Sequence, residues 1–292
     1  MGQGKLRDLL AEPSTPGLLR GEVWINPEVW TRVGFPPGPK GRAAFVRSMG
    51  AELCFFPWPA EGHDEASVLA DAAYGQGLDC ALVIDGPFQR LAGRRDTCTL
   101  LGELVGTPGR FVSRLDQEKE RLRALLDGLE GTPIDLILIG EDVGYTGGLY
   151  FAPEVFHTHL LPFYRELLED FRAKGLAWGW HSDGKVEPLL ADLVDCGFQC
   201  FSLEPEVVDL LAFKKRHPGQ VSLLGGIRAA WLAAESFDRN LEETALTEIR
   251  ALTQEGGLIM ASTCGLHHPT FLPNLRRLYQ LISPLCLDKA GF

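Results

Sequence analysis

The apolar positions of the chain fall into short, unbroken runs, and most of these runs end at a polar residue. Eight runs have the length of a strand: 22–26, 52–56, 80–85, 135–140, 176–181, 199–203, 221–225 and 258–262. Continuous apolar runs are typical of parallel strands buried on both faces, whereas a strand with one wet face alternates. The pattern therefore predicts a sheet of eight parallel strands.

Helical periodicity occupies most of the intervals between these runs. The segment 116–130 carries leucines on one stripe, with Asp116 as its expected N-cap. The segment 153–175 is also expected to be a helix, kinked at Pro162. Further helices are expected over 186–196, 206–217, 239–255 and 272–283. Strand and helix alternate to a count of eight, which predicts an α/β fold of the (β/α)8 TIM barrel type.

One interval is longer than the others. About fifty residues separate the third and fourth runs, and the stretch 97–115 within it has a turn signal of Gly and Pro near its middle. We expect a hairpin inserted over the mouth of the barrel. Because the chain has no low-complexity tract and no flexible linker, residues 1–292 are expected to form a single domain.

Charge and cysteine usage narrow the class of protein. The net charge of −11 and the absence of a Lys/Arg run argue against nucleic acid as a partner. Seven cysteines without a C-x-x-C motif are expected to be reduced thiols, as in the cytosol. The chain has no apolar signal core and no run long enough to span a membrane. We therefore expect a cytoplasmic protein that acts on a small molecule.

Polar side chains stand where the expected strands end. In a barrel, the C-terminal strand ends surround one common cleft, which is where catalytic groups gather. His181 and Asp183 are two residues apart and should point to the same side, above the small residues Ala177 and Gly179. The residues at these strand ends are Asn26, Asp85, Glu141, Asp142, His181, Asp183, Glu204 and Cys264.

A crowd of carboxylates at one mouth needs a compensating cation, and His, Cys and carboxylate ligands suit zinc. The predicted Zn2+ ligands are His181, Glu204 and Cys264, with Asp183 as a further ligand or catalytic group. The candidate catalytic residues are Glu141, Asp142 and Asp183, and the candidate substrate-binding residues are Asn26, Asp85, Tyr145 and Tyr150. Simpler roles stay open: a hydrogen-bonded structural His181, an ordinary free thiol at Cys264, and capping of the glycine-rich loop by Glu141 and Asp142.

Four segments carry a family resemblance: GEDVGYTGGLYFAPEVFHTHLLPFYRELLEDFRAKG at 140–175, HSDGKVEPLLADLVDCGFQCFSLEPE at 181–206, LLGGI at 223–227 and LPNLRRL at 272–278. Through them the region 135–282 resembles the uroporphyrinogen decarboxylase superfamily, which includes zinc-dependent corrinoid methyltransferases. The resemblance implies a (β/α)8 barrel. In the methyltransferase branch, a His-x-Cys pair and a later Cys bind zinc, and the metal makes a thiolate that accepts a methyl group from a corrinoid.

Carried over by position, His181 and Cys264 match that zinc set, whereas Asp183 replaces the middle Cys. Glu204 stands where related barrels have an acidic residue near the metal. Arg228 stands where relatives commonly carry Asp. The substitution of Asp for a thiolate hardens the ligand set and leaves both the metal and the methyl acceptor open.

The leading hypothesis is a metal-dependent methyltransferase that activates a thiol or similar nucleophile, with the corrinoid carried by a separate protein because no corrinoid-binding module is present. One alternative is a metal-free lyase of the decarboxylase type, in which Asp85, Glu141 or Asp142 would bind the NH groups of a tetrapyrrole. The arginine-rich N-terminal motif of that branch is replaced by WINPEVWTRVGF at 24–35. The other alternative is a non-catalytic barrel that binds a corrinoid protein or a small ligand.

Overall fold

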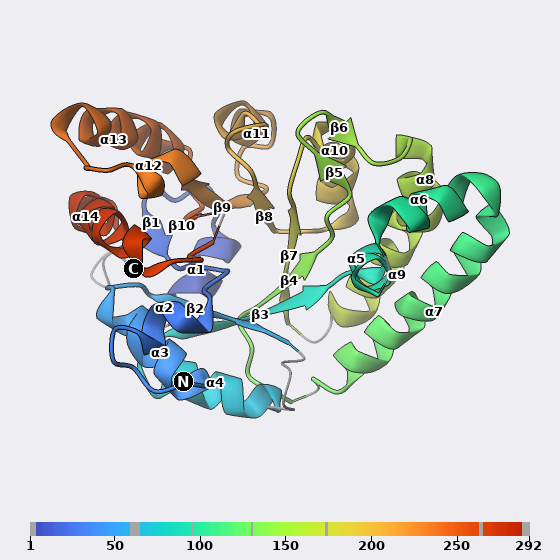
Figure 1. The fold of residues 1–292 in the computed structure, drawn as a ribbon, viewed down its shortest axis with the longest axis horizontal. Coiled ribbons are helices and arrows are strands. Elements are labelled where there is room, and N and C mark those ends of the chain that lie inside the picture. The colour runs from blue at the N-terminus through green and yellow to red at the C-terminus, as the bar shows by residue number, and fades with distance from the viewer. Residues whose placement is uncertain are drawn as a thin grey trace.

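Eight parallel strands form the centre of the molecule (Figure 1). The computed structural model describes residues 4–58, 65–94, 96–129, 131–172, 175–262 and 265–287. In their order around the sheet, the strands are β1 (Leu18–Arg20), β10 (Leu258–Ser262), β9 (Ser222–Ile227), β8 (Cys200–Leu203), β7 (Ala177–Ser182), β4 (Leu136–Gly140), β3 (Asp79–Asp85) and β2 (Leu53–Pro57). All pairings in this sheet are parallel, which confirms the predicted barrel class.

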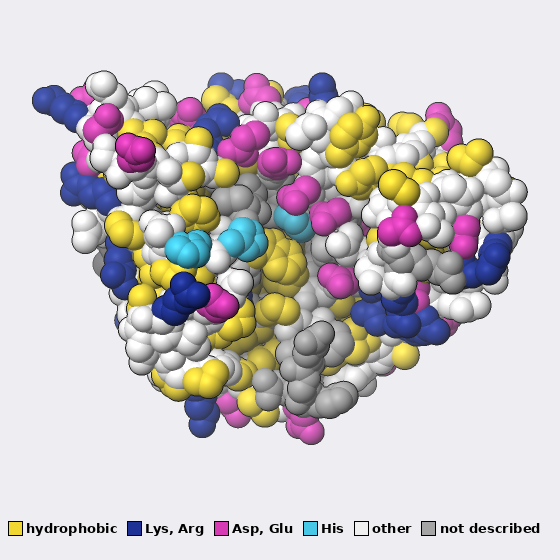
Figure 2. Space-filling model, viewed as in Figure 1, with side chains coloured by type: hydrophobic (Ala, Val, Ile, Leu, Met, Phe, Trp, Pro, Cys, Tyr) yellow, Lys and Arg dark blue, Asp and Glu magenta, His cyan; other side chains and the backbone are white. Residues whose placement is uncertain are grey.

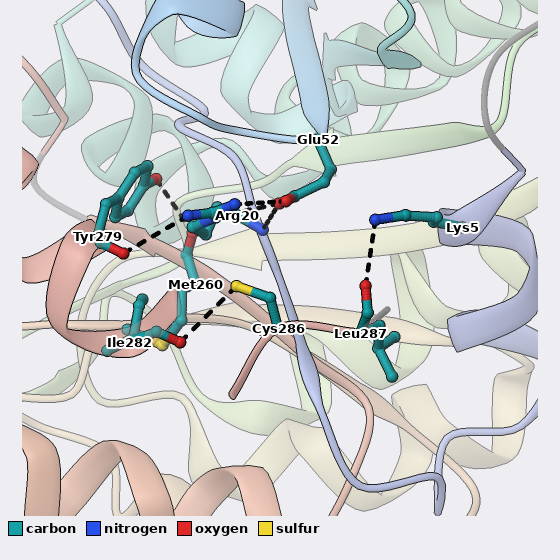
Figure 3. A network of polar contacts seen from close by, with 8 residues as sticks. All are labelled: Lys5, Arg20, Glu52, Met260, Tyr279, Ile282, Cys286 and Leu287. Carbon is teal, nitrogen blue, oxygen red and sulfur yellow. Dashed lines mark hydrogen bonds and ion pairs between the residues drawn. The ribbon is translucent and has the colours of Figure 1, made fainter. Parts of the chain in front are cut away.

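The barrel is nearly closed where β1 meets β2. The backbone N–H of Glu52 donates to the carbonyl of Arg20 at 3.0 Å. The Glu52 carboxylate in turn accepts from the Arg20 backbone at 2.9 Å and pairs with its guanidinium at 2.6 Å. Figure 3 shows the Arg20 side chain between Glu52 and the end of the helix that carries Tyr279. A partly buried ion pair thus joins β1 to the residue before β2, where a regular ladder is absent.

The interior of the barrel is filled by apolar side chains from alternate strand positions. Helix α1 (Lys5–Ala11) contributes three leucines to this core. Its first turn is held by Asp79 at the start of β3, which accepts the backbone N–H groups of Gly4 and Leu6 at 2.9 and 2.8 Å. Because Asp79 begins a strand, α1 covers the N-terminal end of the barrel and leaves the opposite end as the mouth.

Helices cover the outside of the strands, and α6 and α7 extend away from the barrel on one side (Figure 1). No helix among the described residues is both long and apolar enough to cross a bilayer. The helices are α2 (Pro27–Thr31), α3 (Pro39–Ser48), α4 (Ala66–Tyr74), α5 (Pro87–Gly93), α6 (Thr97–Gly106), α7 (Pro108–Asp127), α8 (Pro153–His159), α9 (Leu161–Arg172), α10 (Glu187–Cys196), α11 (Leu210–Arg216), α12 (Ala229–Ala233), α13 (Arg239–Gln254) and α14 (Leu272–Ile282).

Side chains along β7 alternate between the two faces of the strand, as the sequence predicted. Ala177 packs against the barrel interior, whereas Trp178 and Trp180 belong to the layer between strands and helices. The helix expected over 153–175 is interrupted near Pro162, since α8 ends at His159 and α9 begins at Leu161. A proline cannot donate the hydrogen bond that a continuous helix would require there.

The prediction of a hairpin between the third and fourth strands was wrong. The structure has α5, α6 and α7 in this interval. Asp96 caps α6 by accepting the N–H of Thr99 at 2.8 Å. Pro108 lies in the first turn of α7, a position that proline favours, so the Gly and Pro signal marks a helix start instead of a hairpin turn. Asp116 accordingly lies inside α7 and is not its N-cap.

The first strand was also placed wrongly, because it is Leu18–Arg20 and not 22–26. The ladder to β10 uses only three residues, a run too short to stand out as a strand in the sequence. In the expected segment, Ile25 makes an isolated bridge to Leu266, and Asn26 caps α2. A true hairpin does occur elsewhere, formed by β5 (Gly144–Tyr145) and β6 (Gly148–Leu149) just after β4.

Candidate metal centre at the mouth of the barrel

Four neighbouring strands place one residue each at a common level of the mouth. The register pairs Asp85 with Gly140, Gly140 with His181, and His181 with Ser202. Gly140 has no side chain, and the space above it extends to the Asp85 carboxylate, 3.9 Å from where a Cβ would stand. Asp85 and His181 therefore face each other across an open position. Figure 2 shows a hollow at the centre of this face, with acidic side chains gathered along one side of it.

The His181 ring is held from behind and directed toward carboxylates. The side chain is 5% exposed, and its Nδ1 lies 2.9 Å from the hydroxyl of Ser202. Its Nε2 lies 3.7 Å from Oδ1 of Asp142 and 3.7 Å from Oδ1 of Asp183. The ring of Trp24 packs against it, with centroids 5.7 Å apart. This contact with Ser202 leaves Nε2 as the nitrogen that faces the mouth.

The loops that follow β4 and β7 fix the two carboxylates. Oδ1 of Asp142 accepts the backbone N–H of Asp183 at 3.0 Å, and Glu204 accepts the backbone N–H of Gly184 at 3.0 Å. Gly184 has a φ of +82°, and a Cβ there would lie 2.3 Å from the backbone nitrogen of Tyr145. Only glycine suits this turn. The loop after β7 is thus tied to the segments that follow β4 and β8.

The pKa of Asp183 is raised chiefly because the carboxylate is desolvated. The negative charges of Asp142 and Glu204 raise it further, whereas His181 lowers it. Crowded carboxylates of this kind are stabilised in their charged form by a bound cation. The electrostatics of the mouth therefore favour binding of a positive ion.

The geometry suits one divalent metal ion. Ligand atoms of Asp142, His181 and Asp183 all lie within 4.8 Å of one another. Two ligands of a tetrahedral zinc ion, each about 2.1 Å from the metal, lie about 3.4 Å apart. The two contacts of 3.7 Å from His181 need only a small contraction to reach that value. We call Asp142, His181 and Asp183 the acidic triad.

The acidic triad differs in part from the ligand set expected from the sequence. His181 and Asp183 lie in it, and Asp142 joins them. Glu204 lies beside it and supports the Gly184 turn. Cys264 lies outside the described residues. Asp142 was expected at the mouth as a catalytic residue. Parity along β4, which places positions 138, 140 and 142 on the same side, is the signal that could have identified it as a ligand.

Glu141 has the opposite parity and lies outside the mouth. Its side chain is 0% exposed and accepts the backbone N–H groups of Phe88 at 2.7 Å and Gln89 at 3.2 Å, as well as the hydroxyl of Tyr164. Burial raises the pKa of Glu141 to about 8, against the lowering effect of these hydrogen bonds. In the structure, Glu141 caps the N-terminus of α5. A Cβ at Gly86 would lie 1.5 Å from its Oε2.

The candidate substrate-binding residues occupy different places. The Asn26 side chain accepts the N–H of Glu28 at 3.0 Å, so it serves as the cap of α2. Tyr145 and Tyr150 stack on the β5–β6 hairpin, with ring centroids 5.8 Å apart. Burial raises the pKa of Tyr150, and the charges of Asp142 and Asp183 raise it further.

Asp85 lines a cavity of about 320 Å³ at the ends of β2 and β3. Trp24, Arg90 and Arg94 line the same cavity and were not singled out from the sequence. Arg90 and Arg94 lie on and just after α5, a helix that the sequence pattern did not predict. Trp24 lies in the segment that was assigned to the first strand.

Comparison with known proteins agrees with this architecture. A family model described as uroporphyrinogen decarboxylase (URO-D) matches residues 118–284. The methylcobamide:CoM methyltransferase MtaA of Methanosarcina barkeri is 26% identical over 170 residues, which are 58% of this chain and 47% of that protein. The match therefore spans about half the length of that relative.

Solved structures show the same fold. A methyltransferase from Methanosarcina mazei superposes with a TM-score of 0.71 at 16% identity, over 96% of this chain and 97% of the other. A putative vitamin-B12 independent methionine synthase from Listeria monocytogenes gives a TM-score of 0.55 at 12% identity, over 95% and 99% of the two chains. At these identities the likeness is one of fold.

Proposed function

This chain belongs to the uroporphyrinogen decarboxylase family, and on that premise we propose that it is a metal-dependent methyltransferase that methylates a small thiol. The observation that carries the proposal is the acidic triad at the mouth of the barrel. The match to a methylcobamide-dependent methyltransferase supports the reaction class. We propose a corrinoid carried by a separate protein as the methyl donor.

Asp142, His181 and Asp183 would hold the divalent ion, zinc or another first-row metal. When bound, such an ion lowers the pKa of a thiol that approaches it, so that the sulfur is nucleophilic near neutral pH. Two carboxylates beside one imidazole form a harder ligand set than thiolates and still suit zinc. The metal site would then keep a position open for the thiol.

Residues around the acidic triad hold it in place. Ser202 fixes the His181 ring through Nδ1, which leaves Nε2 for the metal. Asp142 binds the backbone of Asp183, so the two carboxylates keep a constant separation. Gly140, with its nearest neighbour 3.9 Å from where a Cβ would stand, leaves room for a substrate beside the ring. These side chains orient the site and take no part in bond making.

The decarboxylase alternative receives less support. A polycarboxylate porphyrinogen would meet the negative charges of Asp85, Asp142, Asp183 and Glu204 at this mouth. Glu141, one of the groups considered for binding pyrrole NH groups, is buried as the cap of α5. Both observations favour a cation and a small substrate over a tetrapyrrole.

The test is thiol methylation by methylcobalamin, followed as formation of the thioether. We expect the activity to require added zinc after chelation, and to fall by about 100-fold or more in His181→Ala and Asp142→Asn. Glu206→Gln is the matched control, since Glu206 is an acidic residue near the mouth that accepts the N–H of Ala229 outside the triad. Methylation that persists unchanged in a chelator and in both triad variants would contradict the proposal.

A further inference from the structure

A small cavity adjoins the acidic triad and contains charges of both signs. It has a volume of about 320 Å³, and its lining includes Trp24, Trp58, Asp85, Arg90 and Arg94. Trp24 also packs against the His181 ring, so one wall of the cavity is shared with the acidic triad. A volume at the low end of ligand sites suits a molecule of amino-acid size.

The Asp85 carboxylate forms the negative part of this cavity. Among the residues that the structure describes, no hydrogen bond or ion pair to another side chain engages it. Burial raises its pKa, Arg90 lowers it and Asp142 raises it, so the charges of the arginine and of the acidic triad both act on this carboxylate. A carboxylate that lines a cavity and is bound by no other described side chain is a natural site for a ligand ammonium group.

Arg90 and Arg94 form the positive part of the cavity. Their Nε atoms lie 3.5 and 3.3 Å from the carboxylate of Glu118, which projects from α7 and is 2% exposed. Glu118 thus holds both guanidinium groups from the side of Nε. Their terminal NH groups are of the kind that bind a carboxylate in a fork. Arg121 also pairs with Glu118 but does not line the cavity.

From the presence of one carboxylate and two arginines in one cavity we propose that it binds the α-amino-acid head group of the thiol, with Asp85 on the ammonium and Arg90 and Arg94 on the carboxylate. This inference takes from the proposed function only that the substrate is a thiol. In such a head group the ammonium and the carboxylate are attached to one carbon, so they lie close together. Asp85 and Arg90 likewise line one small cavity. The side chain would then extend past Trp24 toward His181. A thiol that carries only an anionic group would leave Asp85 facing it without a counter-charge.

The test uses thioethers, which carry no thiol and need no metal to bind. Calorimetry on the full chain as purified, with and without a chelator, compares S-methylcysteine with 3-(methylthio)propanoate, which lacks the ammonium, and 2-(methylthio)ethylamine, which lacks the carboxylate. We expect S-methylcysteine to bind at least about tenfold more tightly than either analogue, because each loses one charge-assisted contact. Equal binding of the propanoate, or binding of none of the three, would overturn the proposal.

Variants assign each charge to its residue. Asp85→Asn should remove the preference for S-methylcysteine over the propanoate, and Arg90→Gln or Arg94→Gln should weaken both carboxylate probes by about tenfold. Arg121→Gln is the matched control, because it removes an arginine from Glu118 without changing the cavity lining. If Arg121→Gln weakens binding as much as Arg94→Gln, the assignment is wrong.

The two proposals fail separately. Binding of S-methylcysteine by a chain that neither holds metal nor methylates thiols would remove the proposed reaction and leave the head-group site. Metal-dependent methylation with no discrimination among the three probes would remove the head-group site alone.

Discussion

Replacement of Glu141 by glutamine should make the protein less sensitive to alkaline pH. The Glu141 carboxyl is fully buried, and its pKa is raised from 4.5 to about 8 in the folded chain. At about 1.4 kcal/mol for each pKa unit, this difference corresponds to about 4 to 5 kcal/mol. Glutamine has nearly the same shape and still offers an oxygen to the N–H groups of Phe88 and Gln89, but it does not ionise.

The sign follows from proton binding. Between pH 4.5 and about 8, the folded state keeps the Glu141 proton that the unfolded chain has lost. The contribution of the Glu141 proton to the free energy of unfolding is therefore complete below pH 4.5, declines as the pH rises, and is lost once the pH passes about 8. Glu22 acts in the same direction, with a pKa raised to about 7 by burial, and it remains in the Glu141→Gln variant.

Urea unfolding at pH 5, 7 and 9 measures this effect. We expect the free energy of unfolding of Glu141→Gln, relative to the parent, to rise by about 4 kcal/mol between pH 5 and pH 9. Thiol methylation should persist, because the side chain lies outside the mouth. A difference in stability that stays constant across this range would refute the reasoning, and a lost activity with unchanged stability would restore Glu141 as a catalytic candidate.

Three further outcomes are expected. Gly86→Ala should destabilise the protein by more than about 3 kcal/mol, since its Cβ would lie 1.5 Å from Glu141. Gly140→Ala, with its nearest neighbour at 3.9 Å, should cost less than about 1 kcal/mol, and thermal unfolding compares the two variants. Ser202→Ala should weaken metal binding by about 10- to 100-fold in a competition titration, and unchanged affinity would show that the Nδ1 contact is dispensable. Asp79→Ala should cost roughly 1 to 3 kcal/mol and speed proteolysis of the α1 segment, because the backbone N–H groups of Gly4 and Leu6 lose their acceptor; an unchanged cleavage rate would contradict this account.

The strands were the most predictable part of the fold. The run 258–262 matches β10, and the run 80–85 matches β3 to within one residue. Strands that are buried on both faces have uninterrupted apolar sequences, which makes them easy to locate. The first strand was misplaced because three residues are enough for its ladder to β10. The insertion before β4 was misread because Pro and Gly mark both turns and helix starts, and only packing decides between them.

At the mouth of the barrel, the sequence predicted which residues follow strand ends, and parity along one strand predicted which of them share a side. His181 and Asp183 share a side of β7, and that relation needs no knowledge of other strands. Asp142 reaches them from β4 through a contact between segments 41 residues apart. Arg90 and Arg94, on and just after the unpredicted helix α5, pair with Glu118 of α7. Such relations are properties of the folded chain, and one sequence does not contain them in a local pattern.

Metal content is the measurement that tests the central claim most directly. Elemental analysis of the full chain after zinc loading and dialysis should give about one equivalent for the parent and less than about a tenth for His181→Ala, with Asp142→Asn and Asp183→Asn in between. Glu206→Gln should match the parent. A parent chain that retains less than a tenth of an equivalent, or a His181→Ala chain that retains as much zinc as the parent, would contradict the assignment of the acidic triad as a metal site.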